Sequence, residues 1–178
     1  MQNWKTLSRQ VILDQSPYLR VESHTIELPN GKILNDWSWI STPDFVIIAV
    51  TTLEGQFLVF RQTKYAIQGT TLATVGGYVN QGEDPLTAAK RELLEEAGYE
   101  APVWESLGEF AVDGSRGNGV AHLFLAREAR KATDIHSDDL EEQDMFFLSR
   151  DELLAAVMRG AFKVLPWQAL MAMALLSS

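Results

Sequence analysis

The segment from residue 84 to residue 98 carries the clearest start and stop signals for a helix in this sequence. Asp84 is a favoured N-cap residue, and Pro85 suits the first helical position, where no backbone N–H is required. Gly98 is the residue type at which helices commonly end. Apolar residues recur at helical spacing and predict one face that docks on a sheet, formed by Leu86, Ala89, Leu93 and Ala97.

Apolar runs on both sides of this helix predict the strands of that sheet. Phe45–Thr52 is a continuous β-branched run, typical of a strand buried on both faces. A turn at Glu54 and Gly55 leads into residues 57–61 and predicts a hairpin. Further strands are expected at 72–75, 103–110, 121–126 and 145–148, and helices at 149–158 and 167–176. Because strands and helices do not alternate regularly, we predict an α+β fold or a mixed sheet between helical layers.

The N-terminal part of the chain reads as a separate strand unit. Residues 7–40 contain short alternating strands, with a turn at 29–32. Trp37 and Trp39 are two residues apart on one expected strand and therefore share a face. We expect an N-terminal strand extension over 1–42, forming a dimer interface, and a main domain over 43–178.

Composition excludes several classes of function. The chain has 24 acidic and 15 basic residues and a formal charge of −9, which disfavours nucleic acid as a partner. It contains no cysteine, so thiolate metal sites and catalytic thiols are excluded. The N-terminus lacks the apolar core of a secretory signal, and the apolar runs are too short to span a membrane. We therefore expect a cytoplasmic protein with no membrane partner.

The helix over 84–98 also carries a group of carboxylates. Glu92, Glu95 and Glu96 stand at i, i+3 and i+4 and share one face, where like charges repel. Arg91 can pair with Glu95, but one cation leaves an excess of negative charge. A divalent cation would turn this repulsion into binding, and oxygen ligands select Mg²⁺ or Mn²⁺. A bare cluster of this kind is otherwise an ordinary solvated acidic face.

The spacing of residues before the helix favours the metal site over the solvated face. Gly77 is followed after five residues by Glu83, and Glu83 after seven more by Arg91. The string GYVNQGEDPLTAAKRELLEEAGY resembles the signature of the Nudix hydrolases, G-x5-E-x7-R-E-U-x-E-E-x-G-U, in which U is a bulky aliphatic residue. The one departure is Tyr99 at the last position. The resemblance implies an α/β/α sandwich with a mixed sheet.

This resemblance also implies the reaction and the roles of the signature residues. A metal-activated water would attack a phosphorus of a diphosphate that links two groups. The expected metal ligands are Glu92, Glu95, Glu96 and the Gly76 carbonyl. Arg91 and Glu83 would orient these carboxylates.

The general base differs between members of the family. It is either a signature glutamate or a glutamate on a later loop. Glu141 and Glu142 are the candidates for the loop version, although a solvated turn in this acidic stretch explains them equally well.

Features outside the signature are similar to the dimeric ADP-ribose pyrophosphatase branch, which hydrolyses nucleoside diphosphate sugars. In that branch, basic residues on the strand before the signature bind the substrate, and Arg61 and Lys64 match them. Aromatic residues from the partner subunit can stack on the base, a role open to Trp37 or Trp39, for which burial in an interface is the alternative. Arg116, in a glycine-rich loop, is a candidate for phosphate or sugar contact, and a flexible strand connection is the alternative for that loop.

The chain also departs from that branch. It has Ala-Thr-Val-Gly-Gly over 73–77, where the branch has a glutamate and a proline before its signature. Because of this departure, the prediction is made for a substrate class: a nucleoside diphosphate sugar, ADP-ribose or a relative.

Two rival functions share the expected fold. A Nudix-like sensor would bind a nucleotide sugar without cleaving it, but such modules would be expected to lose signature glutamates, which this chain keeps. An isoprenoid diphosphate isomerase would rely on a cysteine, which this chain lacks.

Overall fold

The computed structural model describes residues 2–134 and 143–177. The chain forms two compact units, which are described separately below. The N-terminal unit contains Met1–Asp44 together with Ala111–Val120, and the larger unit contains Phe45–Phe110 and Ala121–Ser178. In the part of the chain that the structure describes, the helices are too short or too polar to cross a membrane.

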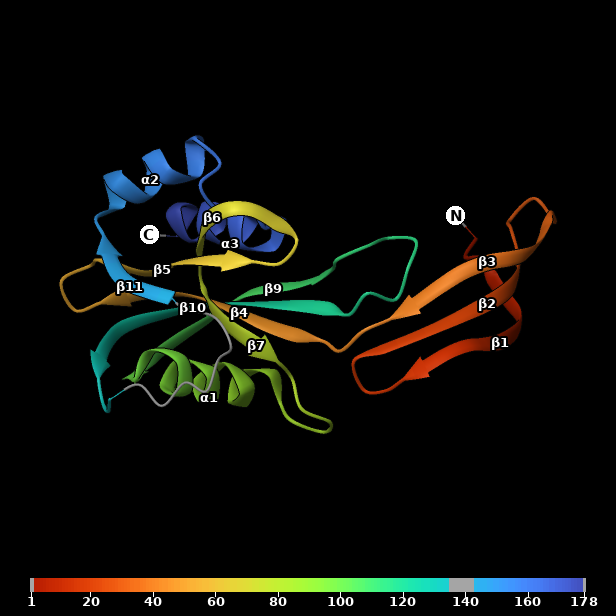
Figure 1. The fold of residues 1–178 in the computed structure, drawn as a ribbon, viewed down its shortest axis with the longest axis horizontal. Coiled ribbons are helices and arrows are strands. Elements are labelled where there is room, and N and C mark those ends of the chain that lie inside the picture. Colours follow the sequence, from red (N-terminus) through yellow and green to blue (C-terminus); the bar gives the residue numbers. More distant parts are fainter. Residues whose placement is uncertain (1, 135–142, 178) are drawn as a thin grey trace. The chain divides into compact units, whose positions relative to one another are not determined.

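The N-terminal unit is built on an antiparallel three-stranded sheet in the order β1-β2-β3 (Figure 1). Its strands are β1 (Lys5–Gln15), β2 (Leu19–Glu27) and β3 (Ile33–Ser41). The turn expected at 29–32 is confirmed, since the Leu28 amide donates to the Lys32 carbonyl at 2.9 Å. Alternate residues of β2 are buried, which aligns them on one face with the tryptophans of β3.

The loop over 111–120 belongs to this N-terminal unit, although it lies far along the chain. Ser41 and Gly117 form an isolated parallel bridge, and the Thr42 amide donates to the Gly117 carbonyl at 3.2 Å. The Trp37 Nε1 donates to the Ser115 carbonyl at 3.2 Å. These contacts fasten the glycine-rich loop to β3.

The larger unit contains an eight-stranded sheet with the path β11-β5-β4-β10-β8, in which β6 pairs with β5, β7 with β4 and β9 with β10. The strands are β4 (Phe45–Thr52), β5 (Phe57–Lys64), β6 (Ile67–Ala73), β7 (Val75–Tyr78), β8 (Tyr99–Glu100), β9 (Val103–Ala111), β10 (Val120–Lys131) and β11 (Gln143–Leu148). Strands β4 and β10 are parallel, whereas β4 is antiparallel to β5 and β7, so the sheet is mixed as predicted.

Helices cover both faces of this sheet (Figure 1). The helix α1 (Pro85–Ala97) packs on one face through a core that includes Leu93 and Phe60. The helices α2 (Arg150–Met158) and α3 (Leu165–Leu176) pack on the opposite face with Leu153 and Met171. The predicted α/β/α sandwich is therefore confirmed.

The single strand expected near 72–75 is in fact two strands. It breaks at Thr74, because β6 pairs with β5 whereas β7 pairs with β4. In the β7–β4 pair Gly76 lies opposite Ile47, so close that a Cβ on Gly76 would overlap the carbonyl oxygen of Val46. This switch of partner brings the two glycines of β7 beside α1.

Candidate functional site

The caps of α1 have the geometry that the sequence predicts. The Asp84 carboxylate accepts a hydrogen bond from the Thr87 amide at 3.0 Å, and Gly98 ends the helix with φ of 70°. The side chains of Ala88, Ala89, Leu93 and Ala97 are buried against the sheet. This burial fixes the rotation of the helix and leaves the carboxylates on its other side.

Arg91 is the centre of the site. Its Nε and Nη2 donate to the two carboxylate oxygens of Glu83 at 3.0 and 3.1 Å, a bidentate pair. Its Nη1 donates to Glu92 at 2.6 Å and to Glu95 at 3.0 Å. A further bond from Nη2 reaches the Tyr78 carbonyl at 3.1 Å and ties α1 to the end of β7.

The charges of this cluster shift its ionisation. The Arg91 guanidinium, followed by the Asn80 amide, lowers the pKa of Glu83 from its ordinary 4.5 to about 2. Reciprocally, Glu83 first and Glu92 next raise the pKa of Arg91. The carboxylate of Glu83 and the guanidinium therefore remain charged at any neutral pH.

Two glycines of β7 let the carboxylates of α1 approach the sheet. A Cβ on Gly77 would overlap the Glu92 carboxyl group, whose side chain is only 12% exposed. The Gly76 amide donates to the Glu96 carboxylate at 2.9 Å. The strand–loop–helix motif thus holds Glu92 and Glu96 against the backbone at the end of β7.

The donor set suits a hard divalent cation. Within the described residues, no three acidic or histidine side chains already converge on one point as metal ligands, since Arg91 and the Gly76 amide hold the carboxylates. Yet Glu83, Glu92 and Glu95 share the single guanidinium of Arg91, so negative charge is in excess. Carboxylate oxygens are the ligands that Mg²⁺ and Mn²⁺ prefer, so these residues fit such an ion.

The basic residues predicted from β5 lie in the larger unit. The Arg61 guanidinium lies 5.1 Å from the centre of the Phe146 ring, and Lys64 ends the strand, half-buried. Phe146 packs on the core beneath α2 and α3. The proposed bases Glu141 and Glu142 lie outside the described residues.

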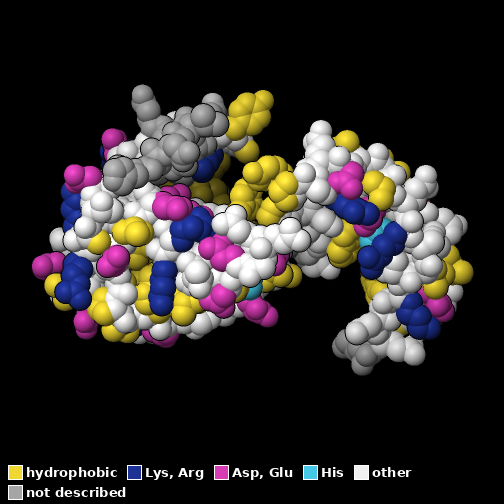
Figure 2. Space-filling model, turned by 90° about the horizontal axis from the view of Figure 1, so that it is seen from below, with side chains coloured by type: hydrophobic (Ala, Val, Ile, Leu, Met, Phe, Trp, Pro, Cys, Tyr) yellow, Lys and Arg dark blue, Asp and Glu magenta, His cyan; other side chains and the backbone are white. Residues whose placement is uncertain are grey.

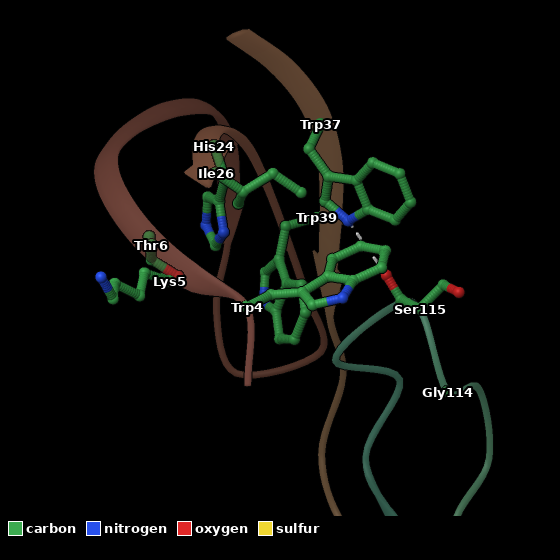
Figure 3. A pocket seen from close by; sticks show the side chains of 9 residues that line it. All are labelled: Trp4, Lys5, Thr6, His24, Ile26, Trp37, Trp39, Gly114 and Ser115. Carbon is green, nitrogen blue, oxygen red and sulfur yellow. Dashed lines mark hydrogen bonds between the residues drawn. The ribbon is translucent and has the colours of Figure 1, made fainter. Parts of the chain in front are cut away.

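Trp37, Trp39 and Arg116 belong to the N-terminal unit, where both tryptophans line one pocket of about 190 Å³ (Figure 3). The Arg116 guanidinium lies over the Trp37 ring, 5.2 Å from its centre. Trp4 and His24, which were not predicted as site residues, also line this pocket. The strand register could have identified His24, because it lies directly opposite Trp37.

Comparisons with known families divide the chain into two matches. The NUDIX domain matches residues 41–168, and the nucleoside diphosphate sugar hydrolase N-terminal domain matches residues 4–40. The first match covers more than half of the chain and includes the whole Arg91-centred site.

Individual relatives agree with these matches. The chain is 28% identical over 137 residues to a methanol dehydrogenase activator of Bacillus methanolicus, covering 76% of this chain and 74% of the relative. It is also 28% identical over 124 residues to an ADP-ribose pyrophosphatase of Bacillus subtilis strain 168, covering 70% of this chain and 66% of that protein. The crystal structure of an ADP compounds hydrolase superposes with a TM-score of 0.80 at 17% identity, covering 98% of this chain and 93% of the other.

Proposed function

Since this chain belongs to the Nudix family and is a pyrophosphate hydrolase of that family, we propose that it hydrolyses a nucleoside diphosphate sugar, ADP-ribose or a relative. The products are a nucleoside monophosphate and a phosphorylated sugar. The observation that carries the proposal is the set of glutamates held around Arg91 at the end of β7. The N-terminal match to nucleoside diphosphate sugar hydrolases and the ADP-ribose pyrophosphatase relative support this class of substrate.

In this proposal Glu92, Glu95, Glu96 and the Gly76 carbonyl hold Mg²⁺ or Mn²⁺. When bound there, such an ion would activate a water molecule and neutralise charge on the diphosphate oxygens. Arg91 restrains Glu92 and Glu95 through its hydrogen bonds. Glu83 in turn fixes the guanidinium in a bidentate pair, so the two act as positioning residues.

The proton of the attacking water needs an acceptor. A signature glutamate or one of Glu141 and Glu142 takes this role in the proposal. Glu95 is the most exposed of the three carboxylates that pair with Arg91, with 54% of its side chain exposed. Its exposure leaves room for a water and a substrate phosphate, which makes it the signature candidate.

We propose that basic and aromatic side chains outside α1 bind the rest of the substrate. Arg61 and Lys64 are proposed to bind the diphosphate or the sugar, since each carries a positive charge in the C-terminal half of β5. Trp37 or Trp39 of the partner subunit is proposed to provide an aromatic ring on which the nucleobase stacks. Arg116, which lies over Trp37, is proposed to bind a phosphate or sugar oxygen beside the base.

We also propose that the chain is a homodimer and that β1 forms part of the interface. All eleven residues of β1 are exposed, among them Leu7, Val11, Ile12 and Leu13. Figure 2 shows hydrophobic side chains on the surface of the N-terminal unit. An edge strand of this length that exposes four large apolar side chains is rarely left open to solvent, because its free backbone groups invite pairing.

A light-scattering mass tests the dimer. The wild type should have twice the mass of one chain, and Ile12→Glu should shift it towards the monomer. A wild-type mass of one chain at working concentration would overturn the dimer without touching the catalytic proposal.

The substrate proposal is tested with a panel of nucleoside diphosphate sugars, dinucleotides and nucleoside triphosphates in the presence of Mg²⁺. A nucleoside diphosphate sugar should be turned over fastest, and EDTA should stop the reaction. Glu96→Gln serves as the matched inactive control, because it keeps the size of the side chain and removes its charge. Preference for a triphosphate would refute the proposed substrate class. Tight binding of a nucleotide sugar without turnover would favour the sensor.

A further inference from the structure

We propose that His24 is a positioning residue of the N-terminal pocket, where it fixes Trp39 as an immobile wall and leaves Trp37 and Trp4 to meet the nucleobase. The inference rests on the proposed function, in which a nucleotide sugar places its base on these tryptophans. It assigns different tasks to rings that the sequence cannot distinguish.

Trp39 is held from several directions. The His24 imidazole stacks on its indole with ring centres 5.3 Å apart and an angle of 15° between the planes. The indole Nε1 donates to the Ser41 hydroxyl at 3.0 Å. The Gly117 backbone lies so close that a Cβ there would overlap the indole ring. Trp39 therefore cannot turn towards a ligand without losing contacts within its own unit.

His24 is itself fixed by charged neighbours. It is only 3% exposed, and its Nε2 lies 3.0 Å from a carboxylate oxygen of Glu22, which is 6% exposed. The other oxygen of Glu22 accepts from Arg20 at 2.9 Å. Residues 20, 22 and 24 share one face of β2, so the array leads from Arg20 through Glu22 to the imidazole. The His24 hydrogen bond, ahead of Arg20, lowers the pKa of Glu22, which keeps this buried carboxylate ionised and paired.

Trp4 is held less tightly than Trp39, and Trp37 is held at its Nε1 by Ser115 and over its ring by Arg116. Trp4 is 54% exposed and meets Trp37 edge-on, with ring centres 5.4 Å apart and planes at 80°. Trp37 is anchored at its Nε1 by the carbonyl of Ser115, on the loop over 111–120. Figure 3 shows the indoles and the imidazole gathered around one opening.

The size of the opening decides what it can accept. Its volume is about 190 Å³. Pockets for whole drug-sized ligands begin at roughly 300 Å³, so this pocket has room for one ring system and not for a complete nucleotide sugar. Aromatic rings stack on any nucleobase, so the pocket contributes affinity for the base end of the substrate.

The test compares His24→Ala, His24→Phe and Trp37→Ala, with Ser23→Ala as the control. Phenylalanine keeps a flat ring against Trp39 and loses the bond to Glu22, whereas alanine loses both. Ser23 lies on the same strand and points to the opposite face of the sheet. Each variant is measured for kcat and KM with the best substrate of the panel. Quenching of tryptophan fluorescence by the matching nucleoside monophosphate (AMP for ADP-ribose) reports binding without turnover.

We expect His24→Ala to raise KM about fivefold or more and to leave kcat within about twofold, because base binding contributes equally before and during the reaction. The monophosphate should quench its fluorescence at correspondingly higher concentration. His24→Phe should recover most of the affinity, which loss of folding in His24→Ala would not predict. Trp37→Ala should raise KM about tenfold, as expected for loss of a stacking partner.

Two results separate the failure of this inference from failure of the proposed function. If Trp37→Ala weakens binding and His24→Ala behaves like Ser23→Ala, the pocket binds the base and the role of His24 is refuted. If neither variant changes KM or quenching, the pocket is not the base site, and both the inference and that part of the proposed function are overturned.

Discussion

Replacing Gly77 by alanine tests whether the position of Glu92 controls catalysis. Gly77 lies in the extended strand β7, so alanine introduces no backbone strain there. The added Cβ would lie 2.3 Å from Cδ of Glu92, whereas ordinary contact begins at 3.4 Å. The carboxylate must therefore move by about 1 Å, away from the hydrogen bond that Arg91 donates to it at 2.6 Å.

The same change affects activity and stability to different degrees. A misplacement of about 1 Å in a catalytic constellation costs on the order of 100-fold in rate. Inserting one methyl group into a close-packed site costs about 1–3 kcal/mol of unfolding free energy. For a chain of this size each kcal/mol lowers Tm by about 2–4 °C. We therefore expect a protein that folds at 25 °C and has lost most of its turnover.

The matched control is Gly55→Ala. Gly55 lies in the β4–β5 turn with φ of 75°, and nothing surrounds its missing Cβ. Alanine there costs about 1–2 kcal/mol through its left-handed backbone, so its loss of Tm overlaps that of Gly77→Ala. Its activity should remain that of the wild type in an Mg²⁺-dependent phosphate-release assay. If Gly77→Ala and Gly55→Ala have equal kcat, the position of Glu92 does not control the reaction and the reasoning is refuted.

Further predictions concern the same helix. Glu95→Gln and Glu96→Gln should each abolish Mg²⁺-dependent hydrolysis and leave the circular dichroism spectrum unchanged; full activity in both would remove α1 from the proposed mechanism. The pKa of Glu83 is about 2 instead of 4.5, so its ionic contact with Arg91 contributes stability above pH 4.5 that is lost as the pH falls towards 2. The difference in Tm between the wild type and Glu83→Gln should therefore shrink between pH 5 and about 2.5, and a constant difference would contradict this linkage. Leu93→Ala removes a fully buried side chain between α1 and the sheet and should cost about 2–5 kcal/mol in denaturant unfolding; a loss below about 1 kcal/mol would mean that α1 is not docked through this residue.

The fold of the larger unit was largely predictable from the sequence because its signals are local. Asp84 and Gly98 cap α1 as predicted, and Phe45–Thr52 forms a strand with the predicted bounds. The break at Thr74 was not predictable, because residues 72–75 read as one continuous strand and β6 and β7 separate only through their different strand partners. Strand pairing depends on distant segments, which a local pattern does not contain.

In the candidate site, too, the features with local signals were predictable and the long-range contacts were not. The spacing from Gly77 through Arg91 predicts the residues of the cluster, and the resemblance predicts that Glu83 and Arg91 support the carboxylates. The bond from Arg91 to the Tyr78 carbonyl was not predictable, because it depends on how α1 docks beside β7. His24 was overlooked for a similar reason, since its partner Trp39 comes from the adjacent strand.

The loop over 111–120 has a consequence for any recombination of this protein. The two family matches meet between residues 40 and 41, which suggests a simple point at which to exchange N-terminal segments between relatives. The N-terminal unit of the structure extends beyond this boundary, because the carbonyls of Ser115 and Gly117 in the loop accept hydrogen bonds from Trp37 and Thr42. A chimaera that takes only residues 4–40 from a relative would join a foreign sheet to a native loop. An exchange that preserves the pocket has to transfer the N-terminal segment and the loop over 111–120 together. The two segments therefore form one structural unit, although they are far apart in the sequence.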